Sequence, residues 1–187
     1  MRVSLCLVLF LALAAPAQTA RGLVVSQERL ASEAGAQVLR EGGTAVDAAV
    51  ATAFALAVVH PAAGNLGGGG FLLSRSTSGQ ARFLDFRETA PAAADPRMWL
   101  KPDGTYDETR HHESLAAVGV PGTVAGLRAA WKREGRLPWA RLLRPAVRLA
   151  REGFVLTENQ AASLAQQLPV FRKHAPTLAQ FSRDGEP

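Results

Sequence analysis

Arg87 is the residue whose position points most clearly to a chemical role. It ends an apolar strand pattern and is followed by Glu88 and Pro91. An arginine at a strand end beside a glycine-rich loop is well placed to bind a carboxylate, because its planar guanidinium donates two parallel hydrogen bonds. A structural ion pair with Asp85 or Glu88 explains the same residue equally well. Residue chemistry alone leaves both interpretations open.

The glycine-rich loop has the sequence GNLGGGG at residues 64–70. A phosphate-binding loop needs a Lys-Ser or Lys-Thr pair after the glycines, and none follows. A dinucleotide-binding loop follows a strand and opens a helix, whereas this run follows a helical pattern and opens a strand pattern. Two interpretations remain: a tight connection from helix to strand, or a backbone that approaches a ligand closely.

Other residue clusters give no catalytic or metal site. His111, His112 and Glu113 are adjacent, so they share no face of a helix or strand, and we expect them in a surface turn. No serine stands between the glycines of a nucleophile elbow. We therefore assign no catalytic residue and expect no metal and no cofactor.

The chain carries 21 basic and 16 acidic residues, a formal charge of +5. Arg141, Arg144, Arg148 and Arg151 recur at spacings of three and four, which places them on one face of a helix. A solvated outer face is the simpler interpretation, and phosphate binding is the alternative. Because aromatic residues are not interleaved with the charges, we expect no nucleic-acid partner.

The N-terminus resembles a secretory signal peptide over residues 1–20. A basic start is followed by an apolar stretch and by the small residues Ala15-Pro16-Ala17. This stretch of about 13 residues is shorter than the roughly 20 that a spanning helix needs, so a membrane anchor is the weaker alternative. Cleavage after Ala17 or Ala20 predicts a secreted or periplasmic protein. The single cysteine lies in this segment, which excludes a disulfide framework.

With a length of 187 residues, 48% of them apolar and 20% charged, the chain fits one folded domain. Residues 23–26 have the pattern of a short strand, and Ser26 is expected to cap a helix that ends at Gly42. Residues 45–59 form a helix that is apolar on every side and therefore buried. It opens with the capping pair Thr44 and Asp47.

The second half combines a hairpin with further helices. Strands are expected at residues 71–75 and 81–87, with Leu84 and Phe86 on one face. A single hairpin is too small for an independent sheet, so it needs further strands as partners. A helix follows from Thr123 to Gly135, with an apolar stripe over Val124, Leu127 and Trp131.

The last helices are expected to end near residue 152 and residue 167. Gly153 closes the first of them, and Pro145 predicts a break near Arg144, because proline removes a backbone hydrogen bond. Thr157 and Gln160 form a capping box for the second.

Four ordered segments are similar to the gamma-glutamyltranspeptidases. These are SEAGAQVLREGGTAVDAAVATAFALAVVHPAAGNLGGGGFLL (residues 32–73), LDFRETAP (84–91), VGVPGTVAGL (118–127) and GRLPWARLLRPAVRLAREGF (135–154). The resemblance implies an α+β, Ntn-hydrolase-type four-layer αββα sandwich, of which residues 21–187 would be the N-terminal part of the large subunit. Only helices and one hairpin of that sandwich would be present.

The resemblance also implies an activity. The family cuts its own precursor, and the N-terminal threonine of the small subunit forms an acyl-enzyme with the gamma-glutamyl group of glutathione or a related donor. Water, an amino acid or a peptide accepts that group. The arginine that binds the donor's alpha-carboxylate corresponds to Arg87, whereas the nucleophile would lie outside this chain. The alternatives are a glutaryl or cephalosporin acylase of the same fold, a separate binding module, and an inactive truncated product.

Overall fold

The computed structural model describes residues 22–186, so the predicted signal peptide at residues 1–20 lies outside the described residues. The elements, in chain order, are α1 (Arg29–Arg40), α2 (Ala45–Val59), β1 (Phe71–Arg75), β2 (Ala81–Asp85), α3 (Glu108–Glu113), the 3₁₀ helix η1 (Leu115–Ala117), α4 (Thr123–Glu134), α5 (Trp139–Glu152), α6 (Glu158–Phe171) and α7 (Ala175–Phe181). None of the described helices is long and apolar enough to span a bilayer.

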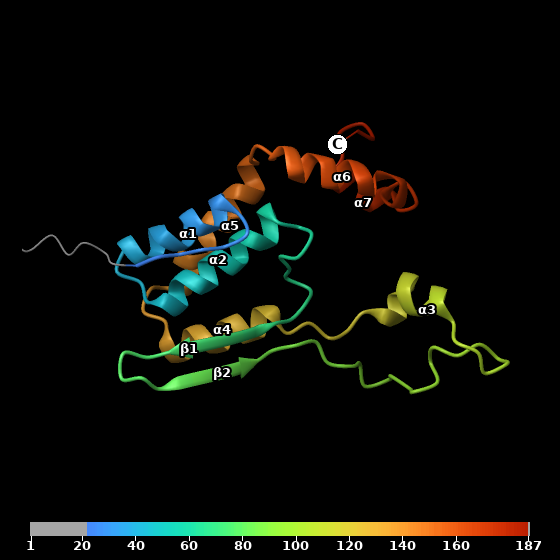
Figure 1. Ribbon diagram of the computed structural model, residues 1–187, viewed down its shortest axis with the longest axis horizontal. Helices are drawn as coiled ribbons and strands as arrows, with labels where there is room; N and C mark the ends of the chain where they lie inside the picture. Colours follow the sequence, from blue (N-terminus) through green and yellow to red (C-terminus); the bar gives the residue numbers. More distant parts are fainter. Residues whose placement is uncertain (1–21, 187) are drawn as a thin grey trace, which may run out of the picture.

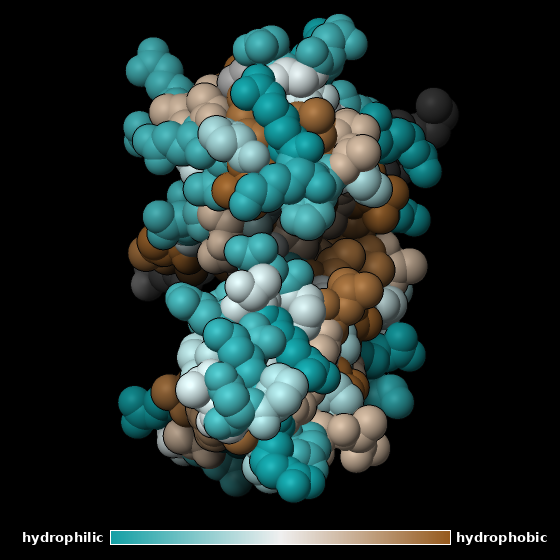
Figure 2. All heavy atoms as spheres, turned by 90° about the vertical axis from the view of Figure 1, so that its right-hand side faces the viewer, coloured by the Kyte–Doolittle hydropathy of each residue, from teal (hydrophilic) through white to brown (hydrophobic). Residues whose placement is uncertain are grey.

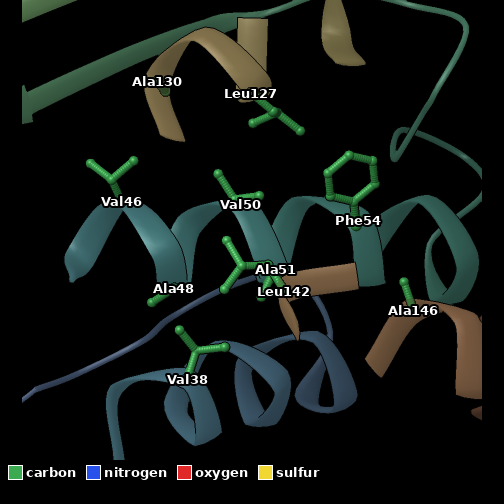
Figure 3. Close-up of a cluster of buried hydrophobic side chains, with 10 residues drawn as sticks. All are labelled: Val38, Val46, Ala48, Val50, Ala51, Phe54, Leu127, Ala130, Leu142 and Ala146. Carbon is green, nitrogen blue, oxygen red and sulfur yellow. The ribbon is translucent and has the colours of Figure 1, made fainter. Parts of the chain in front are cut away.

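Helix α2 is the centre of the molecule, as its apolar sequence predicts. It packs against α1, α4 and α5, and α4 and the hairpin lie together on one side of it in Figure 1. Figure 3 shows Val50 and Phe54 pointing toward Leu127 of α4, whereas Ala51 lies near Leu142 of α5. The predicted bounds of α2 and its capping box with Thr44 are confirmed.

Asp47 is the one charged residue of α2, and it is fully buried. Its Oδ2 accepts hydrogen bonds from the backbone N–H groups of Thr44 at 2.9 Å, Arg136 at 2.9 Å and Leu137 at 3.2 Å. The carboxylate therefore caps α2 and also holds the turn between α4 and α5. The capping pattern predicts the first bond, but the other two join residues about 90 positions apart.

The hairpin has one covered face and one open face. Strands β1 and β2 pair antiparallel with Leu72 opposite Leu84, and both side chains pack against the helical core. On the other face Phe71, Leu73 and Phe83 are largely exposed, and the two phenylalanine rings stack 5.7 Å apart. The predicted alternation of faces is confirmed.

Strand β2 ends at Asp85, two residues before the expected end at Arg87. Phe86 still exchanges two backbone hydrogen bonds with Gly70, at 3.0 and 3.3 Å, and no residue beyond this pair continues the ladder. Arg87 therefore begins a new segment, because its N–H turns to the side chain of Asp85 at 2.9 Å.

Helix α4 begins at Thr123 and ends before Gly135, as predicted. Leu127 and Trp131 of its predicted apolar stripe pack in the core, but Val124 does not. Val124 is 46% exposed, and the buried face instead runs over Thr123, Gly126, Leu127 and Ala130. Phe86, the residue after β2, lies directly on Gly126. A Cβ atom there would fall 2.1 Å from the phenylalanine ring, so only glycine allows this approach.

The break predicted near Arg144 is wrong, because α5 runs unbroken through Pro145. Pro145 lies on the buried face with Leu142 and Ala146, and packing against α2 offsets the lost backbone hydrogen bond. Helix α6 has the predicted capping box at Thr157 but continues to Phe171, past the expected end near residue 167.

Two expectations near the N-terminus are also wrong. Residues 23–26 form no strand, because no other described strand pairs with them. Ser26 does not cap α1, which begins after Glu28, and its hydroxyl instead donates to the carbonyl of Glu28 at 2.8 Å.

Residues 90–119 form an excursion that carries α3 away from the helical core (Figure 1). Its two ends meet where Thr89 and Val120 exchange backbone hydrogen bonds of 3.2 and 2.8 Å. Figure 2 views the molecule from the side of this excursion. Hydrophilic side chains cover much of that face, with a hydrophobic area between its upper and lower parts.

Candidate substrate-binding site at Arg87

The backbone that carries Arg87 is held from two sides. The Phe86–Gly70 pair fixes it to the glycine-rich loop, and the N–H groups of Gly122 and Thr123 donate to the carbonyl of Gly68 at 2.8 and 3.0 Å. The start of α4, the glycine-rich loop and the end of β2 thus meet at one point, although they are far apart in sequence.

The guanidinium of Arg87 is accessible. Its side chain is 66% exposed, and its Nε lies 3.5 Å from Oε2 of Glu88. The guanidinium carbon lies 5.9 Å from the ring centre of Phe71, at cation–π distance. An exposed ion pair of this kind is worth at most about 1 kcal/mol, so a carboxylate ligand can displace Glu88.

Both interpretations of Arg87 therefore find support in the structure. The predicted ion pair exists with Glu88, whereas Asp85 contacts only the backbone of Arg87. The pair leaves the guanidinium open to solvent, which a carboxylate-binding role requires.

Arg87 lies at the edge of an open depression of about 550 Å³. The depression is formed by the residues after β2 and by the returning segment before α4. Its lining includes Arg87, Glu88, Pro91, Met98, Trp99 and Val118. A small acidic ligand bound to Arg87 would therefore lie against apolar side chains on its other side.

The glycine-rich loop approaches the protein's own backbone closely. A Cβ atom on Gly69 would lie 2.7 Å from both the amide nitrogen of Glu88 and the carbonyl oxygen of Phe86. This close packing supports the interpretation as a tight connection. Gly67 differs, since no atom lies within 4 Å of where its Cβ would be.

Asn65 is a structural residue of this region that the sequence analysis did not single out. Its Oδ1 accepts hydrogen bonds from the hydroxyl of Thr123 at 2.6 Å and from the N–H of Gly68 at 3.0 Å. The side chain thus joins the glycine-rich loop to the first residue of α4. An asparagine inside a glycine run was the available signal, because asparagine often bonds to nearby backbone.

The histidine pair lies in the short helix α3 rather than in a turn, and the ring centre of His111 lies 4.7 Å from that of Trp99. The hydroxyl of Tyr106 contacts Nδ1 of His111 and lies 3.3 Å from Nε2 of His112. Among residues 22–186, no three histidine, cysteine, aspartate or glutamate side chains gather as metal ligands.

The four arginines of α5 share one face, as their spacing predicts, and this face borders a groove toward α1. Arg141 forms an ion pair with Glu41 across the groove. This face lies on a different part of the molecule from Arg87.

Comparison with known proteins places the chain in a family. The family model described as Gamma-glutamyltranspeptidase matches residues 31–187. The glutathione hydrolase proenzyme of Escherichia coli (strain K12) is 44% identical over 173 residues, which are 92% of this chain and 30% of that protein. The chain thus spans less than a third of this relative's length.

Solved structures give the same result for the fold. The gamma-glutamyltranspeptidase of Helicobacter pylori matches with a TM-score of 0.84 and 44% identity, over 88% of this chain and 47% of that chain. The cephalosporin acylase of Bacillus halodurans matches with a TM-score of 0.67 and 27% identity, over 89% of this chain and 32% of that chain. The α+β, Ntn-hydrolase fold class predicted from the sequence is confirmed, and the chain belongs to the gamma-glutamyltranspeptidase family.

Proposed function

We propose that the protein containing this chain transfers or hydrolyses the gamma-glutamyl group of glutathione and related compounds. The family match over residues 31–187 and the 44% identity to a glutathione hydrolase proenzyme support this activity. The observation that carries the proposal within this chain is the exposed guanidinium of Arg87, held on a fixed backbone at the edge of a depression.

Arg87 binds the alpha-carboxylate of the donor in this proposal. The carboxylate replaces Glu88 as the partner of the guanidinium and accepts two parallel hydrogen bonds, each worth about 1.5–3 kcal/mol. The ring of Phe71 lies on one side of the guanidinium and restricts its orientation.

The chemical steps belong to residues outside this chain. A threonine at the start of the small subunit, made from the same precursor, attacks the gamma-glutamyl amide and releases its amine. Water, an amino acid or a peptide then takes the gamma-glutamyl group from the threonine. This scheme needs no metal and no other cofactor.

A secreted or periplasmic location is part of the proposal. It rests on the basic start, the apolar stretch and the small residues within residues 1–20. N-terminal sequencing of the protein purified from its native cells tests it, and a mature protein that still begins at Met1 contradicts it.

Kinetics on a gamma-glutamyl anilide test the role of Arg87 in the full-length protein. Arg87→Lys should raise KM about tenfold or more, because an ammonium cannot form the planar two-bond contact. The matched control is Arg82→Lys on β2, where the arginine pairs with Glu134 at 3.4 Å. An unchanged KM in Arg87→Lys, or an equal rise in the control, contradicts the assignment.

The second candidate is an acylase that removes glutaryl side chains from beta-lactams. It is favoured by the match to the Bacillus halodurans cephalosporin acylase, at a lower identity than the transpeptidases. A glutaryl group keeps a carboxylate but lacks the alpha-amine, so Arg87 would serve both substrates. Higher kcat/KM on a glutaryl amide than on a gamma-glutamyl amide would support this candidate.

A further inference from the structure

A strongly basic groove runs between α1 and α5, which lie side by side. It has a volume of about 720 Å³, which falls in the usual range for small-molecule sites. Its floor is apolar and includes Ala34, Pro145 and Leu149. Its rim carries five arginines, namely Arg40, Arg141, Arg144, Arg148 and Arg151.

The acidic residues near the groove neutralise only part of this positive charge. Glu33 of the lining pairs with Arg29, outside the groove, and Glu41 pairs with Arg141. Glu152 lies at the end of the groove. Within the described residues 22–186, Arg144, Arg148 and Arg151 have no ion-pair partner and no side-chain hydrogen bond; these three side chains are exposed.

The geometry of the rim favours a compact anion with several charges. Arg144 and Arg148 are four residues apart on α5, which places their Cβ atoms about 6 Å from each other. Arg40 stands on the opposite helix, where its guanidinium is held by Oε1 of Gln37 at 2.8 and 3.0 Å. Guanidinium groups on both sides of a groove can bind neighbouring phosphates of one ligand at the same time.

The field of the arginines already acts on a nearby carboxylate. The pKa of Glu41 is lowered, first by a hydrogen bond from Gln37 and then by Arg141 and the charge of Arg144. Arg144 thus stabilises negative charge beside the groove although it forms no ion pair itself.

We propose that this groove binds a soluble oligophosphate, at a site separate from Arg87. A phosphate chain carries several negative charges over a short length. It therefore fits the groove between α1 and α5 better than an extended acidic peptide, whose charges are farther apart. The concave floor also disfavours a flat membrane surface, since a bilayer cannot enter the groove between two helices.

Calorimetric titration of the full-length protein with sodium tripolyphosphate tests the proposal. We expect saturable binding that weakens with added salt and is not reproduced by sulfate at equal ionic strength. The double variant Arg144→Gln/Arg148→Gln should bind tripolyphosphate about tenfold or more weakly, because it loses two charge-assisted contacts. Its thermal unfolding midpoint and its activity on a gamma-glutamyl anilide should stay unchanged.

The matched control is Lys132→Gln/Arg133→Gln, which removes the same charge from an exposed part of α4. Equal weakening in both double variants would show that only net charge matters and would overturn the proposal. The absence of saturable tripolyphosphate binding by the unsubstituted protein would overturn it too. So would arginine-dependent binding to phosphatidylglycerol vesicles without binding of tripolyphosphate, because the groove would then recognise a lipid surface.

Discussion

Helix α2 and the hairpin differ in how completely they are covered. Helix α2 is enclosed by α1, α4 and α5, and Val50 has no exposed surface. The hairpin is covered on one face, whereas Leu73 on its outer face is 74% exposed. In a four-layer sandwich the outer face of such a hairpin meets a second layer. The contrast shows that the helical half buries its central helix with its own residues, whereas the hairpin has one apolar face that no described residue covers.

The largest effect is expected at the centre of α2. Val50→Asp places an unpaired charge in the core and should destabilise the full-length protein by more than about 4 kcal/mol, or prevent its folding. Urea denaturation measures the change. Val124→Asp on the exposed face of α4 is the control and should change the stability by about 0.5 kcal/mol or less. A comparable loss in both variants would remove the distinction between core and surface.

Asp47→Ala is expected to cost about 3 kcal/mol, because three backbone N–H groups lose their buried acceptor. Asp107→Ala provides the comparison, since that aspartate caps the short exposed helix α3. Its loss should lower the free energy of unfolding by about 1 kcal/mol or less. Similar losses in chemical denaturation would mean that the buried carboxylate does no more than cap its helix.

The two faces of β1 can be compared directly, because Leu72 and Leu73 are neighbours on opposite sides. Leu72→Ser should destabilise the full-length protein by about 2–3 kcal/mol through lost core packing. If a second layer covers the outer face, Leu73→Ser should cost about 2 kcal/mol as well. A change of about 0.5 kcal/mol or less in Leu73→Ser would show instead that the outer face stays exposed to solvent.

The smallest effect concerns Glu41, at the edge of the helical core. Because its pKa in the folded protein is lowered, the carboxylate stabilises the fold above its unfolded-state pKa of 4.5 and loses this effect as the pH falls through the folded value. Glu41→Gln should therefore lower stability by at most about 1 kcal/mol at neutral pH. The difference should vanish in acid.

Glu108→Gln on α3 is the control for this titration. Its carboxylate forms no ion pair with any described residue, so its replacement should change the stability by about 0.5 kcal/mol or less. A difference between wild type and Glu41→Gln that persists in acid would contradict the electrostatic explanation.

Local signals predicted most of the helices. The unbroken apolar run and the Thr44–Asp47 pair fixed both the position and the burial of α2, and Gly135 marked the end of α4. These features depend on residues a few positions apart. The α+β fold class could be predicted only from the resemblance of the four ordered segments to the family. The local patterns alone indicated one hairpin among helices and no larger sheet.

The errors arose where distant residues meet. Val124 is exposed, whereas Gly126 of the same helix is covered by Phe86, 40 residues earlier in the chain. Pro145 stays helical because its buried face packs on α2. For the site, the sequence predicted Arg87 at the end of the second strand, whereas β2 ends two residues earlier, at Asp85. The partner of this arginine, Glu88, remained one of two choices, and the link from Asn65 to Thr123 joins loops that no local pattern connects.

The backbone pairing of Thr89 with Val120 has a consequence for engineering the protein. Because these hydrogen bonds tie the excursion together at its base, a longer turn at its exposed tip should not pull on the backbone at Arg87. The entropic cost of a longer loop grows only with the logarithm of its length. An epitope tag inserted after Gly104, in an exposed turn, should therefore be displayed on the surface while the backbone around Arg87 keeps its shape.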